Sequence, residues 1–433
     1  MPRNPYPFQI PAIEMGLARN MLLADQCGLG KTYSAIHAVR RVNEEFRPLP
    51  TLVVCPKPLR YQWKEEIELE LPKARVLILD QPMPLAIGNK GNLWLITNYE
   101  GLLRLPGLQR IFFGTIIADE GHRIKNKEAQ RTRALKALQS HRKIILTGTP
   151  LDRNVADLWS LLEWLYPERF RSYWKFYKRY VNHEQDWLHH NHTLPGSSDP
   201  AALAELLGEF MLTRQKKDVA SDLPPLLKTW IPIEMTTAQK RAYKSLKRST
   251  DWFADVEGLG ELEIKNNLSK LTKLLQIASD PRILGSDDEG AKIDWLRQWL
   301  EDNPNEKAIV FSRYRSPVSR LAREFEGAVI TSKETRLVDE WKAGKVRLLF
   351  GTIASCAEGF NFPQASTAIC LDQDWSPIKM AQLDERIHRL GIKEGKQMIY
   401  LTCKGTADEA IRLSLENSWS ARDLIIHLMK EAS

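Results

Sequence analysis

Two short polar stretches of this chain carry the residue types needed for phosphate chemistry. The first, Gly28-Leu29-Gly30-Lys31-Thr32, follows the apolar run 21–24 and precedes a helical pattern over 33–40. Glycines let the backbone approach phosphate oxygens, and a helix N-terminus offers unpaired N–H groups to an anion. In such a loop the lysine reaches the β- and γ-phosphates, and the threonine hydroxyl holds Mg²⁺. The stretch predicts an ATP-binding loop, with an ordinary glycine turn as the alternative; Asp25 stands where G-x-x-x-x-G-K-[ST] begins with glycine.

The second stretch is a pair of carboxylates, Asp119 and Glu120, directly after the apolar run 115–118. An aspartate in this position holds Mg²⁺ through water, and the neighbouring glutamate orients or deprotonates an attacking water. The alternative is a pair of solvated loop acids. We favour phosphate chemistry because a phosphate loop precedes the pair in the same predicted sheet.

The elements that must position these residues are continuous apolar runs separated by helical or polar stretches. In the first half they lie at 21–24, 51–55, 75–79, 93–97, 115–118 and 143–147. Continuous rather than alternating apolar runs indicate a parallel sheet covered on both faces, and strands alternating with helices indicate a doubly wound α/β fold. Ligands bind such folds at the carboxyl ends of the strands, where both polar stretches lie.

A second α/β set follows the break at Leu223-Pro224-Pro225 and contains no second phosphate loop. Its strand candidates are 308–311, 328–330, 346–350, 367–371 and 398–401, and the chain at 229–233 reads as extended. Arg386 and Arg389 are three residues apart, so on a helix they share one face and can reach a γ-phosphate. The alternative is surface salt bridging with neighbouring acids. We expect the second set to serve the nucleotide of the first.

Other stretches leave alternatives open or argue against a site. Gln9 either reads adenine through its amide or begins a helix. The stretch 169–180 mixes basic and aromatic residues, which favours a core-facing helix over a nucleic-acid contact. The histidines between 183 and 192 have no neighbouring cysteine, so zinc is disfavoured.

Composition sets the broad class of the protein. The 433 residues carry a net charge of +8, which favours a polyanionic partner. No apolar run approaches the roughly 20 residues needed to span a membrane. The five scattered cysteines and the absence of a signal-like N-terminus fit a cytoplasmic protein, nucleoid-associated in a prokaryotic or viral setting.

Taken in order, the motifs resemble the superfamily-two helicase motors, and specifically the SWI/SNF-type DNA translocase ATPases. The resemblance spans residues 7 to about 411, and its Asp25-x-x-Gly28-Leu29-Gly30-Lys31-Thr32 is similar to the family's D-E-M-G-L-G-K-T. The segments that carry it further are 54–56 with 62–63, 97–100, 119–126, 146–150, 158–162, 210–219, 374–377 and 384–391. The segments 352–361 and 404–409 look more like the annealing-helicase branch.

The resemblance implies a fold, ligands and roles for particular residues. It implies two RecA-like lobes, at 1–225 with a helical insertion over about 155–215, and at 226–433 with a helical start over about 236–280. ATP and Mg²⁺ would be held by Gln9, Gly28, Leu29, Gly30, Lys31, Thr32, Asp119, Glu120, Gly359 and Gln382, with Arg386 and Arg389 completing the site. Double-stranded DNA would contact Lys57, Asn98, Lys125, Asn126 and Thr352 through its phosphates.

The function implied is an ATP-driven translocase on double-stranded DNA that remodels DNA or protein–DNA complexes, acting as a monomer. The alternative within the same class is a helicase that unwinds or anneals strands at forks. An alternative from another class is a nucleotide-gated DNA-binding scaffold with vestigial hydrolysis.

Overall fold

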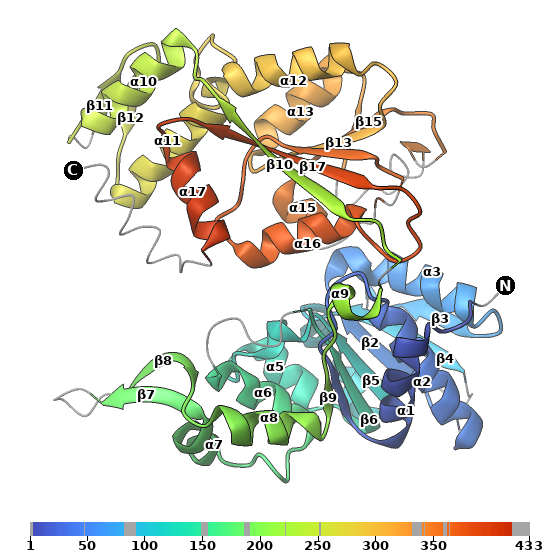
Figure 1. The fold of residues 1–433 in the computed structure, drawn as a ribbon. Coiled ribbons are helices and arrows are strands. Elements are labelled where there is room, and N and C mark those ends of the chain that lie inside the picture. The colour runs from blue at the N-terminus through green and yellow to red at the C-terminus, as the bar shows by residue number, and fades with distance from the viewer. Residues whose placement is uncertain are drawn as a thin grey trace. The chain divides into compact units, whose positions relative to one another are not determined.

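The computed structural model describes residues 3–46, 48–81, 92–148, 155–185, 191–220, 222–250, 253–330, 340–341, 343–357, 362 and 364–417, with backbone alone at 184–185 and 191–195. The chain divides into two compact units, Met1–Asp222 and Leu223–Ser433. Each unit has its own parallel sheet (Figure 1). The division lies close to the predicted boundary at 225/226. No helix among the described residues has the length and apolar character that crossing a bilayer requires.

Unit 1 is built on a seven-stranded sheet whose strand pairs are all parallel. The order is β3-β4-β2-β5-β6-β1-β9. The strands are β1 Met21–Leu23, β2 Thr51–Cys55, β3 Arg75–Ile78, β4 Leu93–Asn98, β5 Phe112–Asp119, β6 Gln139–Leu146 and β9 Met211–Leu212. Six of them match the predicted apolar runs. The two-residue β9 was not predicted, because its pairing partner β1 lies some 190 residues earlier in the chain.

Helices cover both faces of this sheet. The elements η1 Pro7–Gln9, α1 Ile10–Ala18, α2 Lys31–Glu45, η2 Lys57–Leu59 and α3 Arg60–Glu70 lead into and pack on one face. The elements α4 Gly101–Arg104, η3 Pro106–Arg110, η4 Gly121–Ile124, α5 Gln130–Lys136 and α6 Ala156–Leu165 lie on the other. Both faces of the strands are therefore buried, which explains their continuous apolar sequences.

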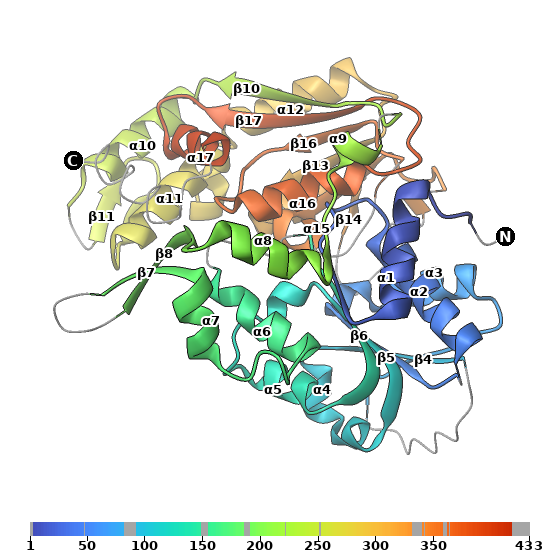
Figure 2. The same cartoon turned by 60° about the horizontal axis from the view of Figure 1, so that its bottom comes forward.

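The insertion after α6 differs from the purely helical segment expected over about 155–215. Helices α7 Tyr173–Tyr180 and α8 Pro200–Gly208 flank an antiparallel hairpin of β7 Val181–Gln185 and β8 Asn191–Ser197 (Figure 2). The hairpin sequence is mostly polar and has neither helical nor strand periodicity, so pattern reasoning missed it. The core-facing interpretation of 169–180 is confirmed for Phe176, Tyr177 and Tyr180, which are buried, whereas Trp174 is 58% exposed. The short helix α9 Lys216–Val219 then leads out of unit 1.

Unit 2 contains a six-stranded parallel sheet in the order β10-β17-β16-β13-β15-β14. The strands are β10 Leu226–Ile233, β13 Ala308–Ser312, β14 Ala328–Val329, β15 Leu348–Thr352, β16 Thr367–Cys370 and β17 Lys396–Cys403. The extended chain expected at 229–233 thus belongs to an edge strand, paired with β17 along its whole length.

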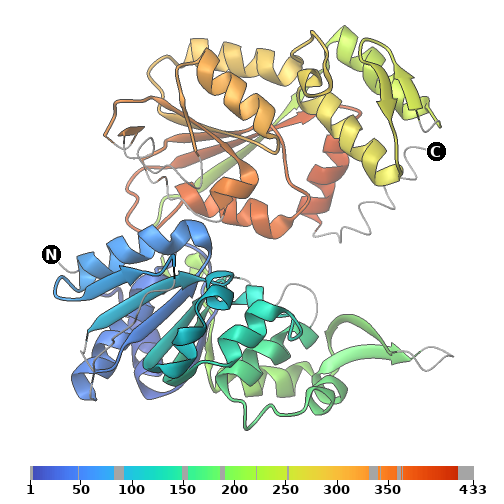
Figure 3. The same ribbon diagram turned by 180° about the vertical axis from the view of Figure 1, so that it is seen from behind.

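Helices also cover both faces of the second sheet. On one face lie α10 Thr237–Arg248, α11 Asn267–Ser279, α12 Ala291–Asp302 and α13 Arg315–Glu324, and Figure 3 shows α12 and α13 over the strands. On the other lie α15 Ile353–Ala357 and α16 Pro377–Ile387, while α17 Ala407–Glu416 packs on α11. A hairpin of β11 Phe253–Val256 and β12 Gly260–Glu263 interrupts the helical start expected over about 236–280. Two RecA-like α/β lobes result, as predicted.

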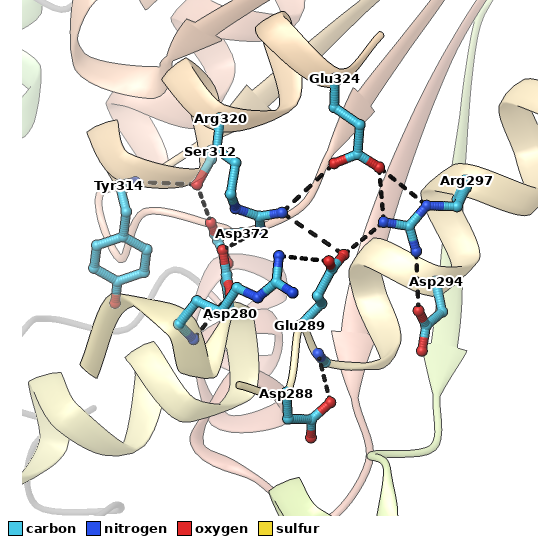
Figure 4. A network of polar contacts seen from close by, with 12 residues as sticks. Asp280, Asp288, Glu289, Asp294, Arg297, Ser312, Tyr314, Arg320, Glu324 and Asp372 are labelled. Atoms are coloured by element: carbon cyan, nitrogen blue, oxygen red, sulfur yellow. Dashed lines mark hydrogen bonds and ion pairs between the residues drawn. The ribbon is translucent and has the colours of Figure 1, made fainter. Parts of the chain in front are cut away.

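An ionic network joins the helices on the first face of unit 2 (Figure 4). Glu289 accepts from Arg297 and from Arg282, each at 2.5 Å, and lies 3.6 Å from Arg320. Arg320 also donates to the buried Asp280 at 2.6 Å. Asp280 follows α11, Arg282 lies in η5 (Pro281–Leu284), Glu289 lies on the loop after it, and Arg297 and Arg320 lie on α12 and α13. The network therefore ties these elements together.

Candidate nucleotide-binding site

Strand register brings the two predicted polar stretches to one edge of the unit 1 sheet. Leu23 of β1 pairs with Leu146 of β6, and Leu146 pairs with Asp119 of β5. The chain leaving β1 enters the glycine loop, and the chain leaving β5 carries Glu120. Since parallel strands end at a common edge, the loop and the acid pair are separated by the single strand β6.

The loop between β1 and α2 has the geometry of a phosphate cradle. Gly28 and Gly30 adopt positive φ angles of 85° and 78°, which glycine reaches without strain. A Cβ at Gly30 would lie 2.5 Å from the Gln9 amide nitrogen, so this position also leaves no room for a side chain. Helix α2 begins at Lys31 without a side-chain cap. Its first N–H groups therefore suit an anion.

The turn after β6 closes against this loop. A Cβ on Gly148 would lie 2.5 Å from Cys27 Sγ and 3.7 Å from Lys31 Nζ. The backbone at Gly148 therefore approaches the loop so closely that a larger residue would press on Cys27. The remaining residues of that turn, Thr149 and Pro150, lie outside the described residues.

Asp119 is held at the end of β5 by three hydrogen bonds. Its Oδ2 accepts from Trp63 Nε1 at 2.8 Å, its Oδ1 from the Glu120 N–H at 2.9 Å, and its carbonyl oxygen from Tyr99 OH at 2.6 Å. Burial and the neighbouring Glu120 raise the pKa of Asp119 to about 6, against the opposing effects of Trp63 and Lys31. A buried carboxylate with a raised pKa is stabilised by a cation.

Glu120 has an unusual backbone conformation for its residue type. Its φ of 52° lies in the left-handed region, which costs a non-glycine residue on the order of 1 kcal/mol or more and is concentrated at functional sites. Its Oε2 lies 3.3 Å from His122 Nδ1.

The donor set fits a magnesium ion. The Thr32 hydroxyl and the Asp119 carboxylate are hard oxygen donors, and Mg²⁺ binds through one or two protein oxygens together with water and phosphate. The residues that the structure describes contain no cluster of three or more His, Cys, Asp or Glu side chains suited to a metal. Mg²⁺ held by one or two protein oxygens takes its other ligands from water and phosphate.

Gln9 combines features of both interpretations that the sequence left open. It ends η1 and precedes α1, its Oε1 accepts from the Tyr6 N–H at 3.0 Å, and its Nε2 donates to the Leu29 carbonyl at 3.1 Å. The side chain is only 2% exposed. Gln9 thus braces the phosphate loop, and its contact with adenine remains a prediction.

Comparison with known proteins places this geometry in a family. The model of the SNF2-related domain matches residues 12–283, and that of the helicase conserved C-terminal domain matches residues 291–391. The chain belongs to the SNF2-related family.

Individual relatives agree with this membership. The DNA annealing helicase and endonuclease ZRANB3 of Mus musculus is 28% identical over 93% of this chain and 39% of its own length. The chromatin structure-remodeling complex subunit snf21 of Schizosaccharomyces pombe is 26% identical over 90% of this chain and 36% of its own. The chain therefore spans less than half of the curated relatives it matches. Among solved structures, the Sulfolobus solfataricus SWI2/SNF2 ATPase core in complex with dsDNA covers 99% of this chain and 94% of its own, with 23% identity and a TM-score of 0.48.

Unit 2 corrects one expectation drawn from residue spacing. Helix α16 ends at Ile387, and His388 adopts an extended conformation while its Nε2 contacts the Pro224 carbonyl oxygen at 2.7 Å. Arg386 and Arg389 therefore do not share a helix face, because Arg389 lies in the turn beyond it. Arg386 donates through Nε to the Ala357 carbonyl at 2.9 Å. Gln382 is buried on α16, and Gly359 lies outside the described residues.

The predicted DNA contacts of this SNF2-related chain differ in exposure. Lys57, Lys125 and Asn126 are exposed near the carboxyl edge of the unit 1 sheet. Asn98 is buried and donates to Glu100 at 2.7 Å. Thr352 caps α15 through Ser355, whose N–H it accepts at 3.2 Å. All five stay predictions, and Asn98 has the least access to a ligand.

Sequence reasoning missed the residues that support the acid pair. Trp63 and Tyr99 lie within motifs quoted for the family resemblance, but no role had been derived for either. The one available signal is that a buried indole or phenol needs a hydrogen-bond partner, but it does not say which partner. Arg214, the partner of Asp25, was also missed, because 189 residues separate the two.

Proposed function

We propose that this chain is an ATP-driven translocase on double-stranded DNA, hydrolysing ATP to ADP and phosphate to remodel DNA or protein–DNA complexes. The observation that carries the proposal is the meeting of the glycine loop and the Asp119–Glu120 pair at one sheet edge. A phosphate cradle alone would support binding. A paired acid site beside it supports hydrolysis.

Each residue of the edge has a distinct part in the proposed reaction. The N–H groups at the start of α2 and the Lys31 ammonium bind the phosphates. Glu120 accepts a proton at its carboxylate from the water that attacks the γ-phosphorus, and ADP leaves. Magnesium, when bound by Thr32 and Asp119, neutralises charge that develops on the phosphate oxygens.

Unit 2 is proposed to act on the same nucleotide through Gln382, Arg386 and Arg389. The guanidinium of Arg386 donates a hydrogen bond to the Ala357 carbonyl, which holds the positive charge in a defined position. Arginines acting in this way contribute about 10³ to 10⁵ to rates of phosphate transfer.

Double-stranded DNA is the proposed partner because the basic chain belongs to a family whose named members act on DNA. Exposed Lys57 and Lys125 would contact phosphates and carry no sequence preference. Binding should weaken with salt, with a slope of about −0.9 per phosphate contact.

A second candidate is a helicase that unwinds or anneals strands at forks, favoured by the similarity to annealing helicases. The deciding experiment measures ATP hydrolysis with duplex DNA, single-stranded DNA and RNA, together with strand displacement and annealing on forked DNA. Best stimulation by duplex without released strand supports the translocase. Best stimulation by RNA would overturn the proposal.

Glu120→Gln separates an enzyme from a nucleotide-gated scaffold. The variant should bind a fluorescent ATP analogue as the wild type does and lose hydrolysis, since only the proton acceptor is removed. Equal and negligible hydrolysis by both proteins would favour the scaffold.

A further inference from the structure

Asp25 occupies the first position of the phosphate loop and forms a buried two-point ion pair. Arg214 donates through Nε to Oδ1 at 2.8 Å and through Nη2 to Oδ2 at 2.5 Å. The Asp25 side chain is 1% exposed and that of Arg214 is 15% exposed. A planar guanidinium matched to a carboxylate fixes orientation as well as distance.

The backbone on either side of this pair is joined by hydrogen bonds. Ala24 N–H donates to Leu212 O at 2.7 Å, and Gln26 N–H donates to Arg214 O at 2.9 Å. Lys216 N–H donates to Gln26 Oε1 at 2.8 Å. The segment 211–216 therefore runs beside the start of the phosphate loop and continues the β1–β9 pairing beyond the sheet.

Arg214 contacts the residue before Gln9, and its partner Asp25 contacts the lysine of the phosphate loop. The Arg214 guanidinium lies 5.5 Å from the centre of the Phe8 ring. The Asp25 carbonyl accepts from Lys31 Nζ at 2.7 Å. The peptide that Arg214 orients through the Asp25 side chain is thus the one that holds the phosphate-binding lysine.

We propose that Arg214 is a positioning residue for ATP hydrolysis, acting on Lys31 through Asp25. The same segment leads through α9 to the end of unit 1 at Asp222, so the chain that enters unit 2 is tied to the phosphate loop. This inference rests on the proposed ATP hydrolysis and adds a residue to it.

The test compares Arg214→Met with Arg169→Met. Arg169 is a matched control because it also forms a two-point ion pair, with Glu209 at 2.5 and 2.7 Å, and also lies near an aromatic ring, 5.8 Å from the centre of Phe170. Neither of these partners belongs to the phosphate loop. With saturating duplex DNA, R214M should lower kcat/KM for ATP about 10- to 100-fold, as expected when a reacting group is misplaced by about 1 Å. R169M should remain within about twofold of the wild type, because its ion pair is half-exposed.

Two further variants keep the test decisive if R214M does not fold. Arg214→Lys keeps the positive charge but loses the two-point guanidinium geometry, and Asp25→Asn keeps the shape of the side chain but loses its charge. Both variants should lower kcat/KM for ATP and the affinity for a fluorescent ATP analogue. The measurements are made at a temperature where melting curves show folded protein. The double variant D25N/R214M should be no worse than the more impaired single variant, since the two residues act through each other.

Three results would overturn the inference: R214M equal to R169M, effects of D25N and R214M that multiply, or melting shifts with unchanged kcat/KM. A wild-type protein without DNA-stimulated hydrolysis would instead refute the proposed function. The two failures are therefore distinguishable.

Discussion

Replacing Lys292 should destabilise unit 2 more than any surface substitution. This lysine of α12 is fully buried, donates to Asp408 Oδ2 at 2.6 Å and to the Leu371 carbonyl at 2.7 Å, and lies 3.6 Å from Asp372 Oδ1. Lys292→Met keeps the length of the side chain but leaves two buried carboxylates without their cation. Removing one partner from a buried ion pair costs about 3–5 kcal/mol.

The quantity to measure is the free energy of unfolding of unit 2. It is obtained from the hydrogen exchange of backbone amides in β13 and β16 at increasing urea concentration. Lys240→Met is the matched control, because Lys240 lies 3.1 Å from Glu234 on the surface and its loss should change the free energy of unfolding little. K292M/D408N should recover part of the loss, since one unpaired charge is gone. A loss for K292M no larger than that for K240M would refute the reasoning.

The pH dependence of K292M has a defined sign. Burial raises the pKa of Asp408, and Lys292 opposes that rise. In K292M the opposition is lost, so the native pKa moves further above the unfolded value of about 3.9. An acid with a raised native pKa penalises the folded state at neutral pH; the penalty begins to shrink when the pH falls below that pKa and is gone below the unfolded pKa. The stability gap to the wild type should therefore narrow as the pH falls from neutral toward about 3.9.

Three other substitutions test unit 1 and unit 2 separately. Trp63→Phe removes a hydrogen-bond donor to Asp119 and should lower the rate of ATP hydrolysis about 10- to 100-fold, because hydrogen bonds to charged groups contribute about 1.5–3 kcal/mol. Trp94→Phe is the control and should leave the rate unchanged, because the buried indole N–H of Trp94 has no partner among the described residues. Burial lowers the pKa of His37, so the unfolded chain binds the proton first and unit 1 loses stability as pH falls below about 6.5. His37→Gln should flatten this decline in melting temperature, and an unchanged decline would contradict it. Arg386→Ala should lower DNA-stimulated hydrolysis about 10³-fold or more with nucleotide affinity retained, whereas the exposed Arg412→Ala on α17 should have little effect.

The sequence predicted the elements whose signals are local. Apolar runs located eleven strands of the two sheets, and glycine spacing located the phosphate loop with its helix. Strands β9 and β10 were missed as sheet members because their partners lie far away in the chain. Edge pairing has little signature in a single sequence.

The candidate site shows the same division. Lys31, Thr32, Asp119 and Glu120 follow from residue type and spacing, and the register of β1, β6 and β5 brings their elements together. The prediction that Arg386 and Arg389 share a helix face was wrong, because α16 ends at Ile387. The next residue, His388, is extended and contacts the Pro224 carbonyl through its side chain, which the residue spacing does not reveal. The partners of Asp119 and Asp25 could not be read, since tertiary packing alone selects them.

The pairing of β9 with β1 also bears on how an ATP-binding fragment could be prepared. β1 is fully buried and hydrogen-bonds to β6 on one side and to 210–212 on the other. A fragment that stops before Phe210 would turn β1 into an open edge with the apolar sequence Met21–Leu23. Such edges recruit strands from other molecules, so the shortened protein would aggregate. The smallest self-contained ATP-binding fragment must therefore extend past Leu212, although the phosphate loop and acid pair are complete by residue 120.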